Sequence, residues 1–398
     1  MRHRLAPGLI LAVLLLARLC HLDIVWVEEG YPSAAAIQML YGKTLYRDIW
    51  FDKPPLSPYV YLLWGAHTGW PLRLAGIGFV LLCCGLAYGF AAQLWSEREG
   101  IYAALLLACY LTFGIPSAVM ALAPDLLMIA PHIGAVWLAW RGRPLASGLV
   151  ASIALLLNPK GLFLAPVCLL WVYRSWWVFL IGFVLPNAAA LLWFGRPYWD
   201  EVWAWGAVYS RHGFPPLTGL TRTLNWIGFQ SAIVAVAVVC LWKHPRSRMA
   251  AWVAVSFLAV CAGWRFFPRY YFQLLVPVVI LAARGFVLLR PRCAIAVALL
   301  LLIPVIRFGP RYMTLASDLI HHRPHHWSDL QLSQDSEEIA SKIPDRSGTL
   351  LVWGYRPDIY ALTRMKAATP FLDSQPLTGV IADRHLVSSE VTYPDLAK

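Results

Sequence analysis

Long apolar runs separated by short connectors are the feature that most constrains this chain. A helix needs about 20 mostly apolar residues to cross the hydrocarbon core of a membrane, and such runs recur from residue 7 to residue 308. Of the 398 residues, 59% are apolar and only 14% are charged, against roughly 25% charged in an ordinary soluble domain. The composition excludes a soluble enzyme and a disordered chain. We therefore expect an all-α polytopic membrane protein.

The apolar runs predict eleven transmembrane helices, with ten or twelve as alternatives. Three of the runs are short for a straight crossing, so we expect them to be broken or to border water-filled space, where irregular backbone is tolerated. The three short runs are 126–140, 145–157 and 161–173. The other expected spans are 7–26, 73–95, 101–119, 176–194, 226–242, 249–264, 270–289 and 293–308.

The charges in the connectors predict the orientation. Cytoplasmic connectors carry an excess of Lys and Arg. With the N-terminus in the cytoplasm, that side holds only two acids, Glu97 and Glu99, against twelve basic residues: Arg2, Arg4, Arg98, Arg141, Arg143, Arg174, Lys243, Arg246, Arg248, Arg284, Arg290 and Arg292. The formal net charge of +12 is thus explained by membrane topology, and we expect no nucleic-acid partner. An odd number of spans places the C-terminus outside the cell membrane.

Three segments are long enough to carry function, and the predicted topology places all of them on the outer face. Residues 1–308 are expected to form the transmembrane domain, with outer loops at 27–72 and 195–225. Residues 309–398 mix acidic and basic side chains almost evenly. We expect this segment to form a small extracytoplasmic α/β unit, with a helix at 335–343 and a strand at 349–353.

The cysteines and histidines do not predict a metal site. The eight cysteines lie in or beside apolar runs, without the Cys-x-x-Cys or Cys/His spacing of zinc ligands. His321, His322, His325 and His326 flank Pro324, which gives them no fixed helical geometry, and no carboxylate or cysteine accompanies them. We expect neither a metal nor a cofactor.

Three carboxylates are candidates for catalysis. Glu28 and Glu29 lie just before a short helical stretch on the outer face. Because adjacent side chains diverge, one can face a cavity while the other is structural; acids at a helix N-terminus also simply complement its dipole. Asp125 begins the apolar run that continues to Trp140. A carboxylate there faces water or a partner, or caps the helix.

Three cations form a second set on the predicted outer side. Lys53, Lys160 and Arg269 each begin or precede an apolar run. Ammonium and guanidinium groups at that depth suit phosphate binding, and guanidinium can bind phosphate with two parallel hydrogen bonds. The alternative for any one of them is a side chain that anchors its helix at the membrane surface.

The order of these residues resembles the GT-C superfamily of membrane glycosyltransferases, in particular protein O-mannosyltransferases and lipid A aminoarabinose transferases. The resemblance is diffuse and covers roughly residues 1–310. It is carried by Glu28-Glu29-Gly30-Tyr31, Gly42 to Asp48, Lys53-Pro54-Pro55-Leu56, Asp125, Lys160-Gly161 and Arg269-Tyr270. Where the family usually has Asp as the presumed base, this chain has Glu28, which is one methylene longer.

The resemblance implies an inverting glycosyltransferase of the cell (inner) membrane. Its donor would be a polyprenyl-phosphate-linked sugar, and its acceptor a lipid, glycan or protein on the outer face. Glu28, Glu29 and Asp125 would be catalytic, whereas Lys53, Lys160, Arg269 and Tyr270 would bind the donor phosphate. The alternatives are a lipid or sugar transporter or flippase, which commonly shows internal repeats that this sequence lacks, and a non-catalytic membrane scaffold.

Overall fold

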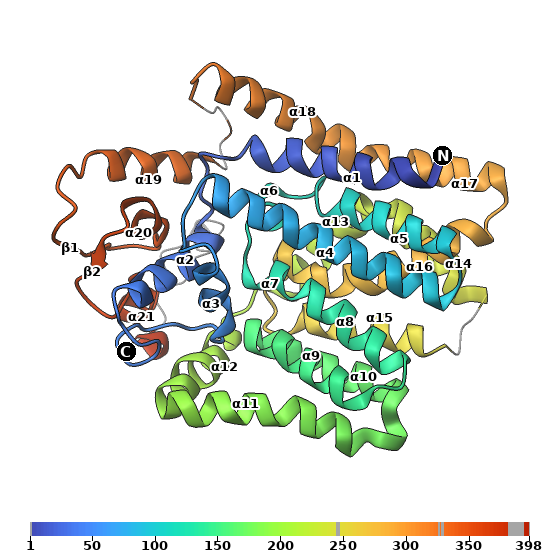
Figure 1. Cartoon of the computed structure of the whole chain (residues 1–398), viewed down its shortest axis with the longest axis horizontal. Helices are drawn as coiled ribbons and strands as arrows, with labels where there is room; N and C mark the ends of the chain where they lie inside the picture. Colours follow the sequence, from blue (N-terminus) through green and yellow to red (C-terminus); the bar gives the residue numbers. More distant parts are fainter. Residues whose placement is uncertain (1, 244–246, 325–326, 328–329, 381–393, 398) are drawn as a thin grey trace.

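The computed structural model describes residues 2–243, 247–324, 327, 330–380 and 394–397. Figure 1 shows the apolar helices side by side along the long axis of the molecule. The helices α2, α3 and α12 gather with the C-terminal elements at one end of this stack. That end is where the two outer loops and the C-terminal segment of the sequence meet. Arg246, His325 and His326 lie outside the described residues.

The N-terminal half is a series of helices with short connections. The expected run 101–119 is divided, because α5 ends before Gly114 and α6 begins at Pro116, where the proline ring suits a first helical turn. The elements are α1 (Arg2–Leu19), α2 (Val27–Leu40), α3 (Leu56–Leu62), α4 (Trp70–Leu94), α5 (Glu97–Tyr110), α6 (Pro116–Val119), α7 (Pro124–Leu127), α8 (Ile129–Trp140), α9 (Pro144–Leu157), the 3-10 turn η1 (Pro159–Phe163) and α10 (Leu164–Val172).

The second half continues in the same way up to α18 and then changes character. Its apolar part comprises η2 (Tyr173–Ser175), α11 (Trp176–Tyr198), the π-helical η3 (Trp199–Ala204), α12 (Trp205–Arg211), α13 (Pro216–Phe229), α14 (Ser231–Lys243), α15 (Arg248–Cys261), the 3-10 turn η4 (Pro268–Tyr271), α16 (Phe272–Leu288), α17 (Pro291–Leu299) and α18 (Leu302–Ile320). The C-terminal part comprises α19 (Gln331–Ser341), β1 (Thr349–Leu350), α20 (Asp358–Thr363), β2 (Lys366–Ala367), α21 (Gln375–Thr378) and η7 (Pro394–Leu396).

Among the described residues, four helical segments are long and apolar enough to cross a membrane, as expected of an integral membrane protein. They are Trp70–Leu94, Pro159–Arg211, Pro268–Leu288 and Pro291–Ile320. Helices α13 and α14 would form a fifth only as a pair, and they are bent by 90°. Several expected spans are shorter apolar helices, such as α9 and α15. The count of eleven spans therefore stays a prediction.

The C-terminal segment packs against the outer loop that follows α1. The predicted helix at 335–343 is α19, and the predicted strand at 349–353 is reduced to β1, which pairs in parallel with β2. The side chain of Gln38 in α2 donates to the carbonyl of Met365 (3.0 Å) and accepts from the backbone N–H of Ala367 (2.7 Å). Helix α18 runs without a break through residue 308, so the expected boundary between the two parts falls inside a helix.

Candidate active site

Helix α2 begins at Val27 and places its two acids in different surroundings. Glu29 is fully buried, and its carboxylate forms an ion pair with Arg73 of α4 (2.6 Å). The same carboxylate accepts hydrogen bonds from the backbone N–H groups of Trp26 (3.1 Å) and Leu122 (3.1 Å). Glu29 therefore joins α2, α4 and the segment before α7, and all the partners that the structure records for it lie inside the protein.

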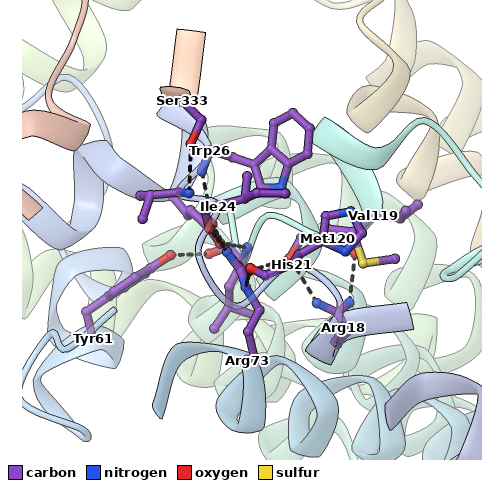
Figure 2. A network of polar contacts seen from close by, with 12 residues as sticks. Arg18, His21, Ile24, Trp26, Tyr61, Arg73, Val119, Met120 and Ser333 are labelled. Atoms are coloured by element: carbon purple, nitrogen blue, oxygen red, sulfur yellow. Dashed lines mark hydrogen bonds and ion pairs between the residues drawn. The ribbon is translucent and has the colours of Figure 1, made fainter. Parts of the chain in front are cut away.

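Figure 2 shows a larger network of polar contacts around Arg73, the ion-pair partner of Glu29. Arg73 also donates to the carbonyl of His21 (3.0 Å), while Arg18 of α1 donates to the carbonyls of Val119 (2.7 Å) and Met120 (2.9 Å). Tyr61 of α3 donates to the carbonyl of Leu122 (2.9 Å). These bonds satisfy backbone groups of a segment that has little regular structure. They fix the approach to α7, and hence the position of Asp125.

Glu28, Asp125 and Arg269 meet at one point, although they come from three distant parts of the sequence. Nη1 of Arg269 lies 2.7 Å from Oε1 of Glu28, and Nε of Arg269 lies 3.5 Å from Oδ2 of Asp125. The other Asp125 oxygen accepts a hydrogen bond from the Asn158 side chain (3.0 Å). The side chains of Glu28 and Arg269 are about one-quarter exposed, so the cluster is reachable from outside the protein.

Lys160 lies beside this cluster. Its ammonium nitrogen is 3.0 Å from the centre of the Tyr270 ring, which gives a cation–π contact. The nitrogen is buried and has no hydrogen-bond partner within the described part of the chain. The charges of Asp125 and Arg269 act on it in opposite directions. A buried ammonium whose hydrogen-bond donors are unused is costly, which suits a site that an anion completes.

Lys53 is placed differently from the other two cations. Its ammonium forms an ion pair with the neighbouring Asp52 (2.6 Å), and its side chain is 40% exposed. Among the described residues, no hydrogen bond or ion pair joins it to the Arg269 cluster. The Tyr31 ring, which stacks on Phe51 (4.8 Å between ring centres), connects this loop to α2. The structure therefore brings together Glu28, Asp125, Arg269, Lys160 and Tyr270, with Lys53 in a neighbouring loop.

Tyr355 is a site residue that the sequence analysis missed. It lies in the C-terminal segment, where the charges of Asp373, Asp52, Glu28 and Arg269 act on it. Burial and these three acids raise its pKa, so the phenol stays protonated. Tyr355 has no motif around it and reaches the cluster only through the packing of the C-terminal segment on α2, so no local pattern could have indicated it.

The described residues contain no group of three or more His, Cys, Asp or Glu side chains arranged to hold a metal ion. The two carboxylates on Arg269 are already neutralised in part by its guanidinium. What the arrangement offers chemically is a carboxylate that can accept a proton, next to cations that can hold an anionic leaving group. The expectation of a metal-free site stays a prediction.

Comparison with solved structures confirms, at the level of the fold, the resemblance seen in the sequence. Comparison of the sequence with family models and with curated proteins gives no match. The chain is similar to ArnT from Cupriavidus metallidurans in the apo state, with 15% identity and a TM-score of 0.65 over 93% of this chain and 87% of that one.

Two further solved structures show the same fold. ArnT from Cupriavidus metallidurans bound to undecaprenyl phosphate has 15% identity and a TM-score of 0.63, over 91% of this chain and 84% of that one. The Archaeoglobus fulgidus oligosaccharyltransferase in complex with Zn and sulfate has 12% identity and a TM-score of 0.50, over 92% of this chain and 62% of that one. At these identities the likeness establishes the fold alone.

Proposed function

We propose that this chain is a polyprenyl-phosphate-dependent glycosyltransferase. It would move a sugar from a lipid-phosphate carrier to an acceptor on the extracytoplasmic face, with inversion at the anomeric carbon. The observation that carries the proposal is the cluster of Glu28, Asp125 and Arg269 beside the buried Lys160, at the end of a helix stack with the GT-C fold. The similar ArnT structure bound to undecaprenyl phosphate supports the choice of carrier.

The proposed topology follows from the charges in the connectors between the apolar runs. Residues 1–308 form the transmembrane part, with the N-terminus in the cytoplasm, and residues 309–398 form the extracytoplasmic segment. A donor that is itself a lipid explains why the site lies at the end of apolar helices, because the carrier chain can then remain in the membrane while its phosphate reaches the cluster. Acceptors of this reaction are lipids, glycans or proteins that carry a hydroxyl group.

In the proposed mechanism Glu28 is the general base. Its carboxylate takes the proton of the acceptor hydroxyl while the acceptor oxygen bonds to the anomeric carbon. The bond from that carbon to the phosphate oxygen breaks, and the electron pair leaves with the polyprenyl phosphate. Arg269 uses Nη1 and Nε for its two carboxylates, which leaves Nη2 to bind the phosphate. Lys160, Lys53 and Tyr270 complete the phosphate site, and the cations stabilise the developing charge without protonating it.

Asp125 supports the base by holding Arg269 from the other side. With both carboxylates present, the guanidinium is fixed in one orientation, and Asn158 in turn fixes Asp125. Glu29 has no catalytic part in this mechanism, because its carboxylate is fully buried against Arg73.

The test is to incubate the purified full chain with a panel of polyprenyl-phosphate sugars and candidate acceptors, and to follow release of the carrier by mass spectrometry. We expect release with at least one donor, and none in the Glu28→Gln variant. Replacing Arg269 by Ala should weaken binding of polyprenyl phosphate by about 1.5 to 3 kcal/mol, the size of a lost charged hydrogen bond. Unchanged affinity in Arg269→Ala, Lys160→Ala and Lys53→Ala would remove the phosphate site from the proposal.

A further inference from the structure

Successive residues of an α-helix are about 100° apart around its axis, and this spacing divides the surface of α13 into three faces. The first is exposed and apolar, and its side chains are 38–73% exposed: Leu217, Leu220, Leu224 and Ile227. The second is exposed and polar: Thr221 and Asn225. The third is turned towards the protein: Gly219, Arg222, Thr223 and Trp226. A surface helix in water needs only a packed face and a polar face, so the exposed apolar face calls for a partner that is not water.

The packed face of α13 holds the segment that carries Arg269. Nη1 of Arg222 donates to the backbone carbonyl of Arg265 (2.8 Å). One turn further along the helix, the hydroxyl groups of Thr223 and Tyr271 share a hydrogen bond (2.8 Å). Arg265 and Tyr271 lie on either side of Arg269 in the sequence. Helix α13 therefore holds this segment both before and after the guanidinium that binds Glu28 and Asp125.

The fit between α13 and this segment is close. A Cβ atom on Gly219 would lie 2.5 Å from a ring carbon of Phe266, and the ring of Trp226 stacks on that of Tyr271 (5.3 Å between ring centres). Trp264 and Phe266 both adopt left-handed backbone conformations, with φ of 51° and 47°. Side chains other than glycine hold such conformations only where the surroundings enforce them. The shape of the segment therefore depends on the position of α13.

The exposed apolar face of α13 continues into a membrane helix. Only Gln230 separates the end of α13 from the start of the apolar α14, and the two helices are bent by 90°. With α14 as a crossing helix, as the sequence predicts, this bend lays α13 along the membrane surface. A helix in that position buries its apolar face at the boundary between lipid headgroups and acyl chains, and turns its polar face to water. This arrangement accounts for all three faces of α13.

We propose that α13 is a membrane-surface helix that couples the outer leaflet to the phosphate site. Its leucine and isoleucine side chains insert among the lipids, and its opposite face keeps the segment around Arg269 in position. Thr223 is accordingly a positioning residue, because it acts on Arg269 through Tyr271. The coupling to donor binding rests on the proposed function, in which Arg269 binds the phosphate, whereas the lipid contact of α13 does not.

The lipid contact is tested with spin labels on the full chain in phosphatidylcholine nanodiscs, after Cys293→Ser removes the exposed native cysteine. Labels are placed at Leu224→Cys on the apolar face and at Asn225→Cys on the polar face. We expect the first label to collide mainly with oxygen, which concentrates in lipid, and the second mainly with a water-soluble nickel chelate. Collision of the first label mainly with the nickel chelate would overturn the proposal. Shielding of the first label from both reagents would also overturn it, because a protein, such as a second copy of the chain, would then cover the face.

The coupling is tested by binding of farnesyl phosphate in the same nanodiscs. Thr223→Val keeps the shape of the side chain but removes the hydrogen bond to Tyr271, so the affinity should fall about two- to tenfold, and Thr223→Ser should restore it. Thr221→Val is the matched control: its hydroxyl donates only to the Leu217 carbonyl of its own helix (2.9 Å), and we expect wild-type affinity. Equal affinities of Thr223→Val and Thr221→Val would contradict the positioning role.

A second pair of variants tests the lipid face itself. Leu224→Asn should weaken farnesyl phosphate binding, because a polar side chain draws α13 away from the lipid, whereas Leu192→Asn, at an exposed leucine of α11, should not. Equal affinities of these two variants would contradict the coupling. Arg269→Ala separates the two proposals. If Arg269→Ala weakens binding and the α13 variants do not, only the coupling fails, whereas wild-type binding in Arg269→Ala contradicts the proposed phosphate site and leaves the spin-label result to decide the lipid contact.

Discussion

Adjacent residues at the start of a helix point about 100° apart around its axis, and this separation places Glu28 and Glu29 in different surroundings. Glu28 reaches Arg269 in a partly exposed cluster, while Glu29 is fully buried against Arg73. The sequence contains both acids but not the direction in which each points. Only the position of α4, which supplies Arg73, assigns the buried role to Glu29.

We expect Glu28→Gln to lose turnover without losing stability. Glutamine keeps the size of the side chain but cannot accept a proton, so the rate should fall about 10²- to 10⁴-fold, the usual contribution of a general base. Carrier release measured by mass spectrometry reports the rate, and a thermal melt in detergent reports the fold. Glu28→Asp should also impair turnover, because the shorter side chain loses reach towards the acceptor. Near-normal turnover in Glu28→Gln would remove Glu28 from the mechanism.

The neighbouring substitution Glu29→Gln should have the opposite outcome. It leaves the Arg73 guanidinium buried without its counter-charge, and breaking a buried ion pair in this way costs about 3 to 5 kcal/mol. We expect a markedly lower melting temperature and poor recovery from the membrane. A stable Glu29→Gln protein with wild-type melting would show that the network in Figure 2 does not hold α2 in place.

At the scale of elements, α2 and α20 meet at Gly30, where there is no room for a side chain. A Cβ atom on Gly30 would lie 2.8 Å from the Cα atom of Asp358, which is backbone and cannot move aside alone. Gly30 therefore allows the C-terminal segment to dock against the helix that carries Glu28. Gly30 is part of the Glu28-Glu29-Gly30-Tyr31 motif in the sequence. The position requires glycine because of a contact with a residue more than three hundred positions away.

Gly30→Ala should loosen this docking. Overpacking a close contact typically costs about 1 to 3 kcal/mol, and here the strain is relieved by separation of α20 from α2. We expect faster cleavage of the C-terminal segment in limited proteolysis and reduced turnover. Gly78→Ala in α4 is the matched control, because nothing lies within 4 Å of its added Cβ. Equal proteolysis of the two variants would argue against the close contact as the anchor of the segment.

Hydropathy predicted which parts of the chain are helical, and the structure departs from it where local geometry intervenes. The expected span 226–242 covers the end of α13 and most of α14, and the 90° bend between these two helices falls inside it. Hydropathy reports how apolar a run of residues is on average. It does not report the direction in which the chain continues after that run. For the same reason the α/β character of the C-terminal segment was predictable, whereas the position of Tyr355 beside Glu28 was not.

At the scale of the whole molecule, the proposed orientation can be tested with a native probe. Cys293 is the one cysteine among the described residues that is exposed, and it follows the basic Arg290 and Arg292. The proposed topology puts it in the cytoplasm and Ser341 of α19 outside. In intact cells an impermeant thiol reagent should label Ser341→Cys and leave the wild-type protein unlabelled, whereas permeabilised cells should label both. Labelling of Cys293 from outside would reverse the orientation.

The two hydrogen bonds that join Gln38 to Met365, just before β2, and to Ala367 of β2 also have a consequence for synthesis of the chain. A ribosome finishes α2 long before it adds the residues that pair with Gln38. Helix α2 is therefore complete before the residues that hold its Gln38 side chain have been made. A polypeptide that ends before residue 365 would insert its apolar helices, but the helix that carries Glu28 would lack these two hydrogen bonds. Under the proposed function, we therefore expect chains that end before residue 365 to be inactive even when their apolar helices are inserted.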